Sequence, residues 1–170
     1  MSVSSPALDD LLPTAQRAAL HLEMRDTYAG SSPTFAAWLA GEPLDRTEPD
    51  RQWHARITPL AARGIDVHRA RIISEPVSDF IRYEHEVTPD ANIAAGEKVR
   101  WVPRGRVSDL ALPGNDFWLI DDTVLFLHFS GDGRRVDTEL VTEPAVWTLC
   151  ATAFETAWQR GIDHADYQPT

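Results

Sequence analysis

Two hydrophobic periodicities alternate along this chain and predict an α/β fold. Leu20–Met24 alternates apolar and polar residues, which is the pattern of a half-buried strand. Residues 50–63 instead place large apolar side chains on one helical face, and Gly64 follows as a stop. Further apolar segments predict strands at residues 65–73, 97–102, 117–120, 123–129 and 136–141.

The strongest helical pattern lies near the C-terminus. Apolar residues recur at positions 147, 150, 151, 154 and 158, so they form one stripe of a helix that starts at Thr142-Glu143-Pro144 and ends at Gly161. Shorter helical patterns predict helices at residues 7–12, 14–19 and 34–40. A further helix is predicted from Ser74-Glu75-Pro76 to about Glu86, with the proline in its first turn.

Together these elements predict a single α/β domain with a mixed central sheet and helices on both faces. Strands 117–120 and 123–129 are apolar on both faces, so we expect them to be central and covered on both sides. A turn at Asp121-Asp122 joins them. The length of 170 residues fits one domain, which we place at residues 7–162, between a disordered N-terminus (1–6) and a polar tail (163–170).

Composition and charge narrow the classes of function. The formal net charge of −10 argues against direct nucleic-acid binding, which needs Lys and Arg to neutralise phosphates. The single cysteine, Cys150, lies on the apolar stripe of the last helix and is predicted to be a core residue. Because there is no signal-peptide pattern and no apolar run of about 18 residues, we expect a cytoplasmic protein without a membrane segment.

Basic residues on two strands predict an anion site. Arg69 and Arg71 share one face of strand 65–73, and Lys98 and Arg100 share one face of strand 97–102. If these strands pair, the four cations form one patch beside the helix N-terminus at Ser74, a setting that favours a phosphate or a carboxylate. The alternative is internal ion pairing with a nearby acidic residue, Glu75, Glu84 or Glu86, or a solvated edge strand.

Other side chains near this patch complete the candidate site. Asp79 and Arg82 have the i, i+3 spacing of an ordinary surface pair on a helix. His128 alternates in phase with Val124 and Phe126, so it is either a ligand contact or a hydrogen-bonded core histidine. The candidate ligand-binding residues are Arg69, Arg71, Ser74, Glu75, Asp79, Arg82, Lys98, Arg100, Trp101 and His128.

No metal or cofactor is predicted. The six histidines show no i, i+4 pair, and only one cysteine is present, so the spacing of a zinc site is absent. The turn at Ser130–Gly133 is too short for a calcium loop. The chain also lacks a phosphate-binding P-loop, a dinucleotide-binding glycine motif and the serine elbow of hydrolases.

Three sequence blocks resemble an uncharacterised actinobacterial family, one of the domains of unknown function. The blocks are Arg71–Glu84, Val99–Arg104, and Leu112–Asp122 with His128-Phe129. The resemblance covers nearly the whole chain and implies no established activity. Genes of that family often lie near helix-turn-helix regulators, so the resemblance implies such a regulator as a partner.

The order of elements resembles one half of a phospholipase D-like domain. That superfamily carries His-x-Lys followed by four residues and Asp, and the histidine is its nucleophile. With Asp121 as the motif aspartate, positions 116 and 114 hold Asp and Gly; with Asp122, positions 117 and 115 hold Phe and Asn. The resemblance therefore implies a non-catalytic descendant and, because such halves often pair about a two-fold axis, a homodimer.

Two functions from different classes remain open. The first is a non-enzymatic regulatory or interaction module that binds a partner protein, such as a helix-turn-helix transcription regulator, or a small anionic ligand. The alternative is a divergent phosphodiesterase or other hydrolase whose pocket lies near Arg71, Ser74, Arg100 and His128. The alternative requires these polar side chains to converge in one deep cleft.

Overall fold

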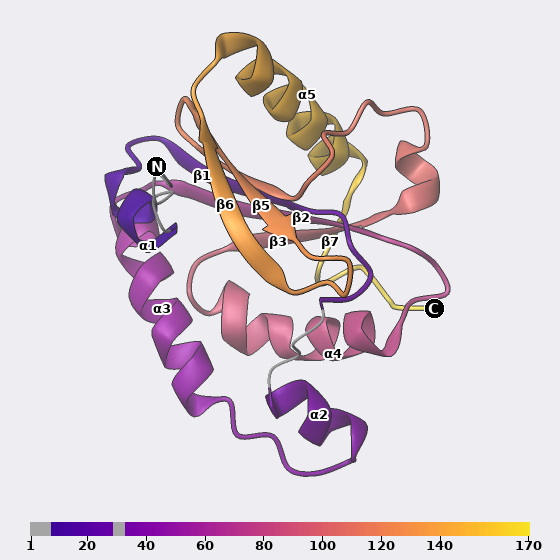
Figure 1. Ribbon diagram of the computed structural model, residues 1–170. Helices are drawn as coiled ribbons and strands as arrows, with labels where there is room; N and C mark the ends of the chain where they lie inside the picture. The colour runs from indigo at the N-terminus through magenta and orange to yellow at the C-terminus, as the bar shows by residue number, and fades with distance from the viewer. Residues whose placement is uncertain (1–7, 29–32) are drawn as a thin grey trace.

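The computed structural model describes residues 8–28 and 33–170, which form one seven-stranded mixed sheet with helices on both faces (Figure 1). This arrangement confirms the predicted fold class. The strand order is β6-β5-β4-β1-β2-β3-β7; β1, β2 and β3 run parallel, and the other pairs are antiparallel. The strands are β1 (Ala18–Glu23), β2 (Asp66–Ile73), β3 (Lys98–Pro103), β4 (Phe117–Ile120), β5 (Thr123–Phe129), β6 (Arg135–Val141) and β7 (Ile162–Asp163).

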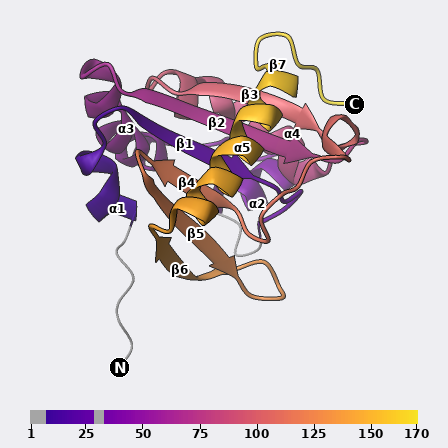
Figure 2. The ribbon, with the colours of Figure 1, turned by 90° about the horizontal axis from the view of Figure 1, so that it is seen from above.

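Helices cover the two faces unequally. The long C-terminal helix crosses one face of the sheet, and the other helices lie on the opposite side (Figures 1 and 2). The helices are α1 (Leu8–Leu11), α2 (Pro33–Leu39), α3 (Thr47–Ala62), α4 (Asp79–Thr88) and α5 (Pro144–Arg160). Three short helical turns connect elements, namely η1 (Leu12–Thr14), the π-helical η2 (Pro89–Ile93) and η3 (Arg104–Val107).

The sheet separates two main hydrophobic cores. On β4, Trp118 packs toward α3, whereas Phe117 packs toward α5, so this central strand is buried on both faces as predicted. Cys150 of α5 is fully buried, and its burial raises the pKa of the thiol to about 11. The prediction of a core cysteine is therefore confirmed. Gly96 allows η2 and β3 to approach α3 closely, because a Cβ there would lie 2.6 Å from the Cβ of Ala61.

The helix predicted at residues 14–19 is wrong, because β1 already begins at Ala18. The carboxylate of Asp121, in the β4–β5 turn, accepts hydrogen bonds from the backbone N–H groups of residues 16, 17 and 18. A long-range contact thus holds this entry to β1 in an extended form, which local propensity does not reveal. The predicted disorder at residues 1–6 lies outside the described residues.

The helix predicted from Ser74 starts later than expected. The backbone N–H of Ser74 donates to the Asp26 carboxylate at 2.6 Å, and the Glu75-Pro76 peptide bond is cis. Helix α4 begins at Asp79, and the Oγ atom of Ser78 accepts a hydrogen bond from the N–H of Ile81 at 3.2 Å. The helix therefore starts at a serine N-cap and not at the proline.

We expect the substitution Ser78→Ala to lower the free energy of unfolding by about 1–2 kcal/mol, because an N-cap contact is lost. The same hydroxyl also donates to the carbonyl oxygen of Asp26 at 2.5 Å, which favours the upper end of this range. Urea unfolding followed by circular dichroism measures the effect. The matched control is Ser108→Ala, which removes an exposed hydroxyl outside α4. Equal stability of the two variants would contradict the assignment of Ser78 as the cap.

The segment expected to be a polar tail packs against the sheet. Strand β7 pairs with β3, and Tyr167 is 3% exposed. The hydroxyl of Tyr167 donates to Glu75, and the backbone N–H of Val77 donates to the carbonyl oxygen of Thr170. The C-terminal residues thus cover the region before α4, where the sequence predicted an open anion site.

Candidate functional site

The predicted patch of four cations does not form. Strands β2 and β3 are indeed parallel neighbours, but their register places Arg69 opposite Val99 and Ala70 opposite Arg100. Paired residues of neighbouring strands project to the same face, so Arg69 and Arg71 point toward α3 and α4, whereas Arg100 points toward α5. Lys98 lies in phase with Arg100, and it is exposed. The prediction of one patch is therefore wrong.

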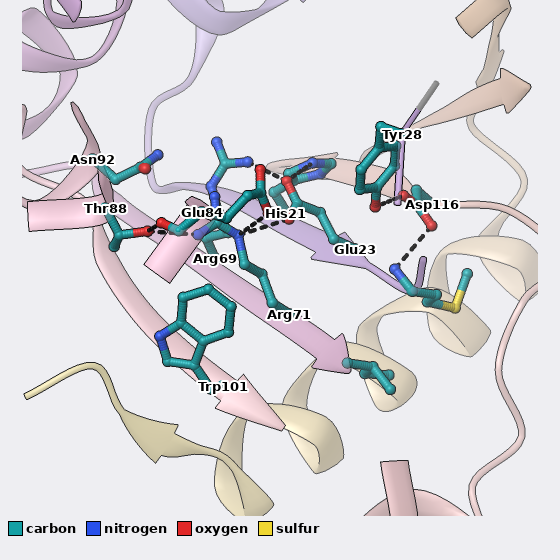
Figure 3. Close-up of polar contacts among 12 residues, drawn as sticks. His21, Glu23, Tyr28, Arg69, Arg71, Glu84, Thr88, Asn92, Trp101 and Asp116 are labelled. Atoms are coloured by element: carbon teal, nitrogen blue, oxygen red, sulfur yellow. Dashed lines mark hydrogen bonds and ion pairs between the residues drawn. The ribbon is translucent and has the colours of Figure 1, made fainter. Parts of the chain in front are cut away.

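Arg69 and Arg71 belong instead to a buried ion cluster with Glu23, Glu84 and Glu97. Figure 3 shows the two arginines with Glu23 and Glu84. Glu23 bridges the two guanidinium groups; its Oε2 lies 2.8 Å from Nε of Arg71, and its Oε1 contacts Arg69. Arg69 reaches Glu97 at 2.8 Å, and Arg71 reaches Glu84 at 3.4 Å. The internal ion-pair alternative thus holds with Glu84, but the sequence reading missed Glu23 and Glu97.

Aromatic rings enclose the guanidinium groups of this ion cluster. Arg69 lies over Trp53 and Trp118, at 5.3 and 5.6 Å from the ring centroids, and Arg71 lies 5.0 Å from the centroid of Trp101. Trp101, one of the predicted ligand-binding residues, is fully buried. It packs against Arg71 and does not face an open site. Each contact is a cation–π pair in a dehydrated setting, where such pairs are strongest.

The ion cluster contains more carboxylates than guanidinium groups. Burial raises the pKa of Glu84 to about 7, and the neighbouring Arg71 only partly opposes this. Glu23 is also buried, but Arg71 and Arg69 hold its pKa well below the usual range. With Glu84 protonated, the two remaining carboxylates balance the two arginines. The cluster therefore holds one carboxyl group that changes its charge near neutral pH.

His21 joins the buried ion cluster from β1. Its ring stacks on Trp118 with 4.4 Å between centroids. The Nδ1 atom lies 2.8 Å from the carbonyl oxygen of Phe117, and Nε2 lies 3.3 Å from Oε1 of Glu23. Both ring nitrogens therefore face oxygen atoms. The polar residues of β1, His21 and Glu23, are thus buried under the helices and not exposed to solvent.

The segment after β1 is anchored by a second buried acid. Asp116 accepts hydrogen bonds from the hydroxyl of Tyr28 at 2.5 Å and from the backbone N–H of Met24 at 3.0 Å (Figure 3). Burial raises the pKa of both Asp116 and Tyr28. Asp116 thereby ties the end of β1 to the start of β4.

A cleft of about 420 Å³ opens over the ion cluster, between α3 and the sheet. Its floor includes Arg69, His21 and Trp118, and its walls include Trp53 and Asn92. We call it the arginine cleft, because four arginines line it and no Asp or Glu belongs to its lining. These arginines are Arg46, Arg56, Arg69 and Arg135.

Three of the four arginines are held by carboxylates that lie outside the lining of the arginine cleft. Arg46 pairs with Asp50 at 2.8 Å, and it also donates to the hydroxyl of Tyr83 at 2.5 Å. Arg56 pairs with Asp9 at 2.7 Å, and Arg69 pairs within the ion cluster. Within residues 8–28 and 33–170, no carboxylate pairs with Arg135, which is exposed on the edge strand β6. Among the described residues, Arg135 is thus the cleft arginine without a carboxylate partner, and carboxylates orient the other three.

The remaining candidate residues lie apart from the arginine cleft. Ser74 donates its hydroxyl to Asp26 at 2.7 Å and accepts from Arg104, which closes the end of β2. Asp79 and Arg82 are exposed on α4, and Glu75 accepts from the C-terminal segment. These four residues therefore do not form an anion site at the helix N-terminus.

His128 and Arg100 make separate contacts at distant parts of the sheet. His128 is only half-buried and lies 3.0 Å from Glu139 of β6, so it is neither a core residue nor a neighbour of Arg71. Arg100 pairs with Asp163 of β7 at 2.7 Å. The convergence that the hydrolase alternative requires among Arg71, Ser74, Arg100 and His128 is therefore absent.

No group of three or more His, Cys, Asp or Glu side chains in residues 8–28 and 33–170 could hold a metal ion. In that part of the chain, no helix combines the length and the apolar character needed to cross a bilayer.

Comparisons with known proteins identify a family and a fold. A family model described as a domain of unknown function (DUF6879) matches residues 6–169. Among curated proteins, none matches the sequence.

One similar solved structure is that of TrmBL2, an archaeal chromatin protein described as showing a novel mode of DNA binding. The TM-score is 0.50 and the sequence identity is 11%, and the match covers 91% of this chain and 48% of that chain. This chain thus spans about half the length of TrmBL2. A second similar structure is that of Nuc, a phospholipase D family member from Salmonella typhimurium. The TM-score is 0.47 and the sequence identity is 14%, and the match covers 91% of this chain and 86% of that chain. The likeness to TrmBL2 concerns the fold alone.

Proposed function

The chain belongs to DUF6879, a family described as a domain of unknown function, and from that premise we propose that it is a non-enzymatic regulatory module that binds a small anionic ligand in the arginine cleft. One observation carries the proposal: in a chain of net charge −10, four arginines and a histidine line one cleft whose lining includes no carboxylate. The volume of about 420 Å³ also falls within the range of small-molecule sites, about 300–1,000 Å³.

The fixed positions of the guanidinium groups support anion binding. Arg46, Arg56 and Arg69 are each oriented by a carboxylate or a hydroxyl outside the lining, so little side-chain entropy is lost when a ligand binds. Guanidinium groups donate two parallel hydrogen bonds to carboxylates and phosphates. Arg135 adds a charge that no carboxylate of the described residues neutralises.

We expect citrate, used as a probe, to bind in the arginine cleft, and the substitution Arg135→Gln to weaken this binding about fivefold. A factor of five corresponds to about 1 kcal/mol, the size expected for one charged contact near the surface. Isothermal titration calorimetry measures the affinity. Binding should also weaken as sodium chloride is raised, because salt screens exposed charges.

The matched control is Arg134→Gln. It removes the same charge one position away, and Arg134 pairs with Asp132 in the hairpin turn and does not line the cleft. We expect this variant to bind citrate as the wild type does. Equal affinities of the two variants, or a failure of citrate, inorganic phosphate and benzoate to bind at millimolar concentration, would overturn the proposal.

The regulatory part of the proposal assigns a protein partner as well. A helix-turn-helix regulator has a basic DNA-binding surface, and the net charge of −10 supports its attraction to this protein in the cytoplasm. Ligand binding in the cleft would then alter the affinity for the regulator, and a homodimer is a second form of partnership. Direct DNA binding, which the description of TrmBL2 states for that protein, is not part of the proposal because the net charge opposes it.

The partner is tested by affinity capture of the tagged protein from its native host, with and without citrate. We expect a helix-turn-helix protein to be recovered and its yield to change when citrate is present. The control bait is the Arg135→Gln variant, whose yield should respond less to citrate. Recovery of no such regulator in either condition would refute this part of the proposal.

A further inference from the structure

A second cavity lies directly beside the arginine cleft. It has a volume of about 640 Å³ and lies between α3 and the N-terminal segment that contains α1 and η1. Its apolar lining consists of Leu12, Pro13, Ala55, Pro59 and Leu60. We call it the apolar groove. Its size also falls in the range of small-molecule sites, about 300–1,000 Å³.

The arginine cleft and the apolar groove share a wall. Gln52 and Arg56, one turn apart on α3, line both cavities. On α1, Leu8 lines the cleft, and its neighbour Asp9 lines the groove. The two cavities are therefore adjoining parts of one surface. Four arginines line the cleft, whereas the groove combines its five apolar residues with Arg51, Arg56 and Arg63.

An ion pair between Arg56 and Asp9 stands at this boundary. The Nε atom of Arg56 lies 2.7 Å from Oδ1 of Asp9, and the side chains are 41% and 56% exposed. Exposed ion pairs contribute little to stability, because water solvates both charges. Asp9 contacts Nε and Nη2 of Arg56, so the guanidinium group can still donate through Nη1 to an anionic group of a ligand while Asp9 keeps it oriented.

We propose that the ligand is an amphiphilic anion, whose charged head group binds in the arginine cleft and whose alkyl chain lies in the apolar groove. This inference rests on the proposed function. The head group pairs with Arg56 and with the other arginines of the cleft, and the chain covers Leu12, Ala55 and Pro59. Charge complementarity and the shared wall select this occupant over a purely apolar molecule or a short anion.

The experiment compares acetate, hexanoate, decanoate and decan-1-ol as probes, using calorimetry and tryptophan fluorescence on the full chain. We expect decanoate to bind at least about a hundredfold more tightly than acetate, because each buried methylene contributes about a threefold to fourfold gain. Decan-1-ol, which lacks the charge, should bind about tenfold more weakly than decanoate.

Three variants assign the two parts of the ligand. Arg56→Gln should weaken decanoate binding about tenfold and decan-1-ol binding much less, because the charge of Arg56 pairs with the head group while its side chain also lines the groove. Ala55→Phe fills the groove and should weaken decanoate binding about tenfold. Its matched control is Ala62→Phe, an exposed position on the same helix outside both linings, which should bind decanoate as the wild type does. Thermal unfolding verifies that each variant is folded.

The outcomes separate this inference from the proposed function. If decanoate binds no more tightly than acetate while citrate still binds in a manner that depends on Arg135, the amphiphile is refuted and the anion site stands. If decan-1-ol binds as tightly as decanoate and Arg56→Gln has no effect, the groove is an independent apolar site and the inference is wrong. If neither citrate nor decanoate binds, both proposals fall.

Discussion

The substitution Glu23→Gln is expected to lower the free energy of unfolding by about 3–5 kcal/mol, the largest single effect that we predict. Glu23 is the only carboxylate of the buried ion cluster that contacts both Arg69 and Arg71. Glutamine keeps the shape of the side chain but removes the charge, so two buried guanidinium groups lose a shared partner. An uncompensated buried charge loses its hydration without an equivalent contact.

Urea unfolding and differential scanning calorimetry measure this loss. The matched control is Glu48→Gln, which neutralises the partner of Arg51 in an exposed pair whose side chains are 57% and 71% exposed. We expect a much smaller change there, because water solvates both charges of an exposed pair. If Glu23→Gln unfolds at the same urea concentration as Glu48→Gln, the ion cluster does not contribute to stability in the way that its burial and geometry indicate.

The ion cluster also determines the arginine cleft, because Arg69 belongs to both. Glu23 and Glu97 orient the guanidinium group from below, while Trp53 and Trp118 enclose it. A loss of Glu23 should therefore weaken anion binding as well as stability.

The second large effect concerns pH. Burial raises the pKa of Glu84 to about 7, above its value of about 4.5 in an unfolded chain. A carboxyl group whose pKa is raised by folding stabilises the fold in its protonated form, so its contribution is fully present below pH 4.5 and is lost as the pH rises through 7. We expect this contribution to fall by about 2 kcal/mol between pH 5 and pH 8.

Other groups titrate in the same window with the opposite sign. Burial lowers the pKa of His164 to about 4 and also lowers the pKa values of His68 and His85, so these residues favour the folded state as the pH rises. The test is therefore the difference in unfolding free energy between the wild type and Glu84→Gln, measured from pH 5 to pH 8. The pKa of Glu23 lies well below 4.5, so its titration falls outside this range.

The stability of the wild type relative to Glu84→Gln should decline across this range and level off above pH 8. The matched control is Glu86→Gln, which removes an exposed carboxylate from the same helix outside the ion cluster. A flat difference for Glu84→Gln would show that this carboxyl group is ionised throughout, with its charge fully compensated by Arg71.

Much of the fold was predictable, because it depends on patterns within single elements. Strands β4 and β5 and the end of α5 at Gly161 lie where the hydrophobic pattern placed them. The errors fall at entries to elements, where contacts from distant residues decide the backbone. Asp121 holds the start of β1 extended, and Asp26 delays the start of α4.

The candidate site was only partly predictable. Alternation within β2 correctly placed Arg69 and Arg71 on one face, and the proximity of β2 to β3 was also correct. Alternation within a strand, however, says nothing about the phase between two strands, and a shift of one residue moves a side chain to the other face. The register pairs Arg69 with Val99 and Ala70 with Arg100. The side chain of Arg100 therefore projects from the opposite face of the sheet to that of Arg69.

By itself, the amino-acid sequence determined the fold class, the buried helix around Cys150 and the strand that carries Arg69 and Arg71, because these follow from periodicities of neighbouring residues. It also excluded the phospholipase D motif, because that motif is a local spacing. Only the tertiary structure decided which acids neutralise the two arginines and which four arginines share a cleft. Three of these arginines lie on different segments: Arg46 on a loop, Arg56 on a helix and Arg135 on an edge strand. Local sequence patterns do not predict that these segments are adjacent in the fold.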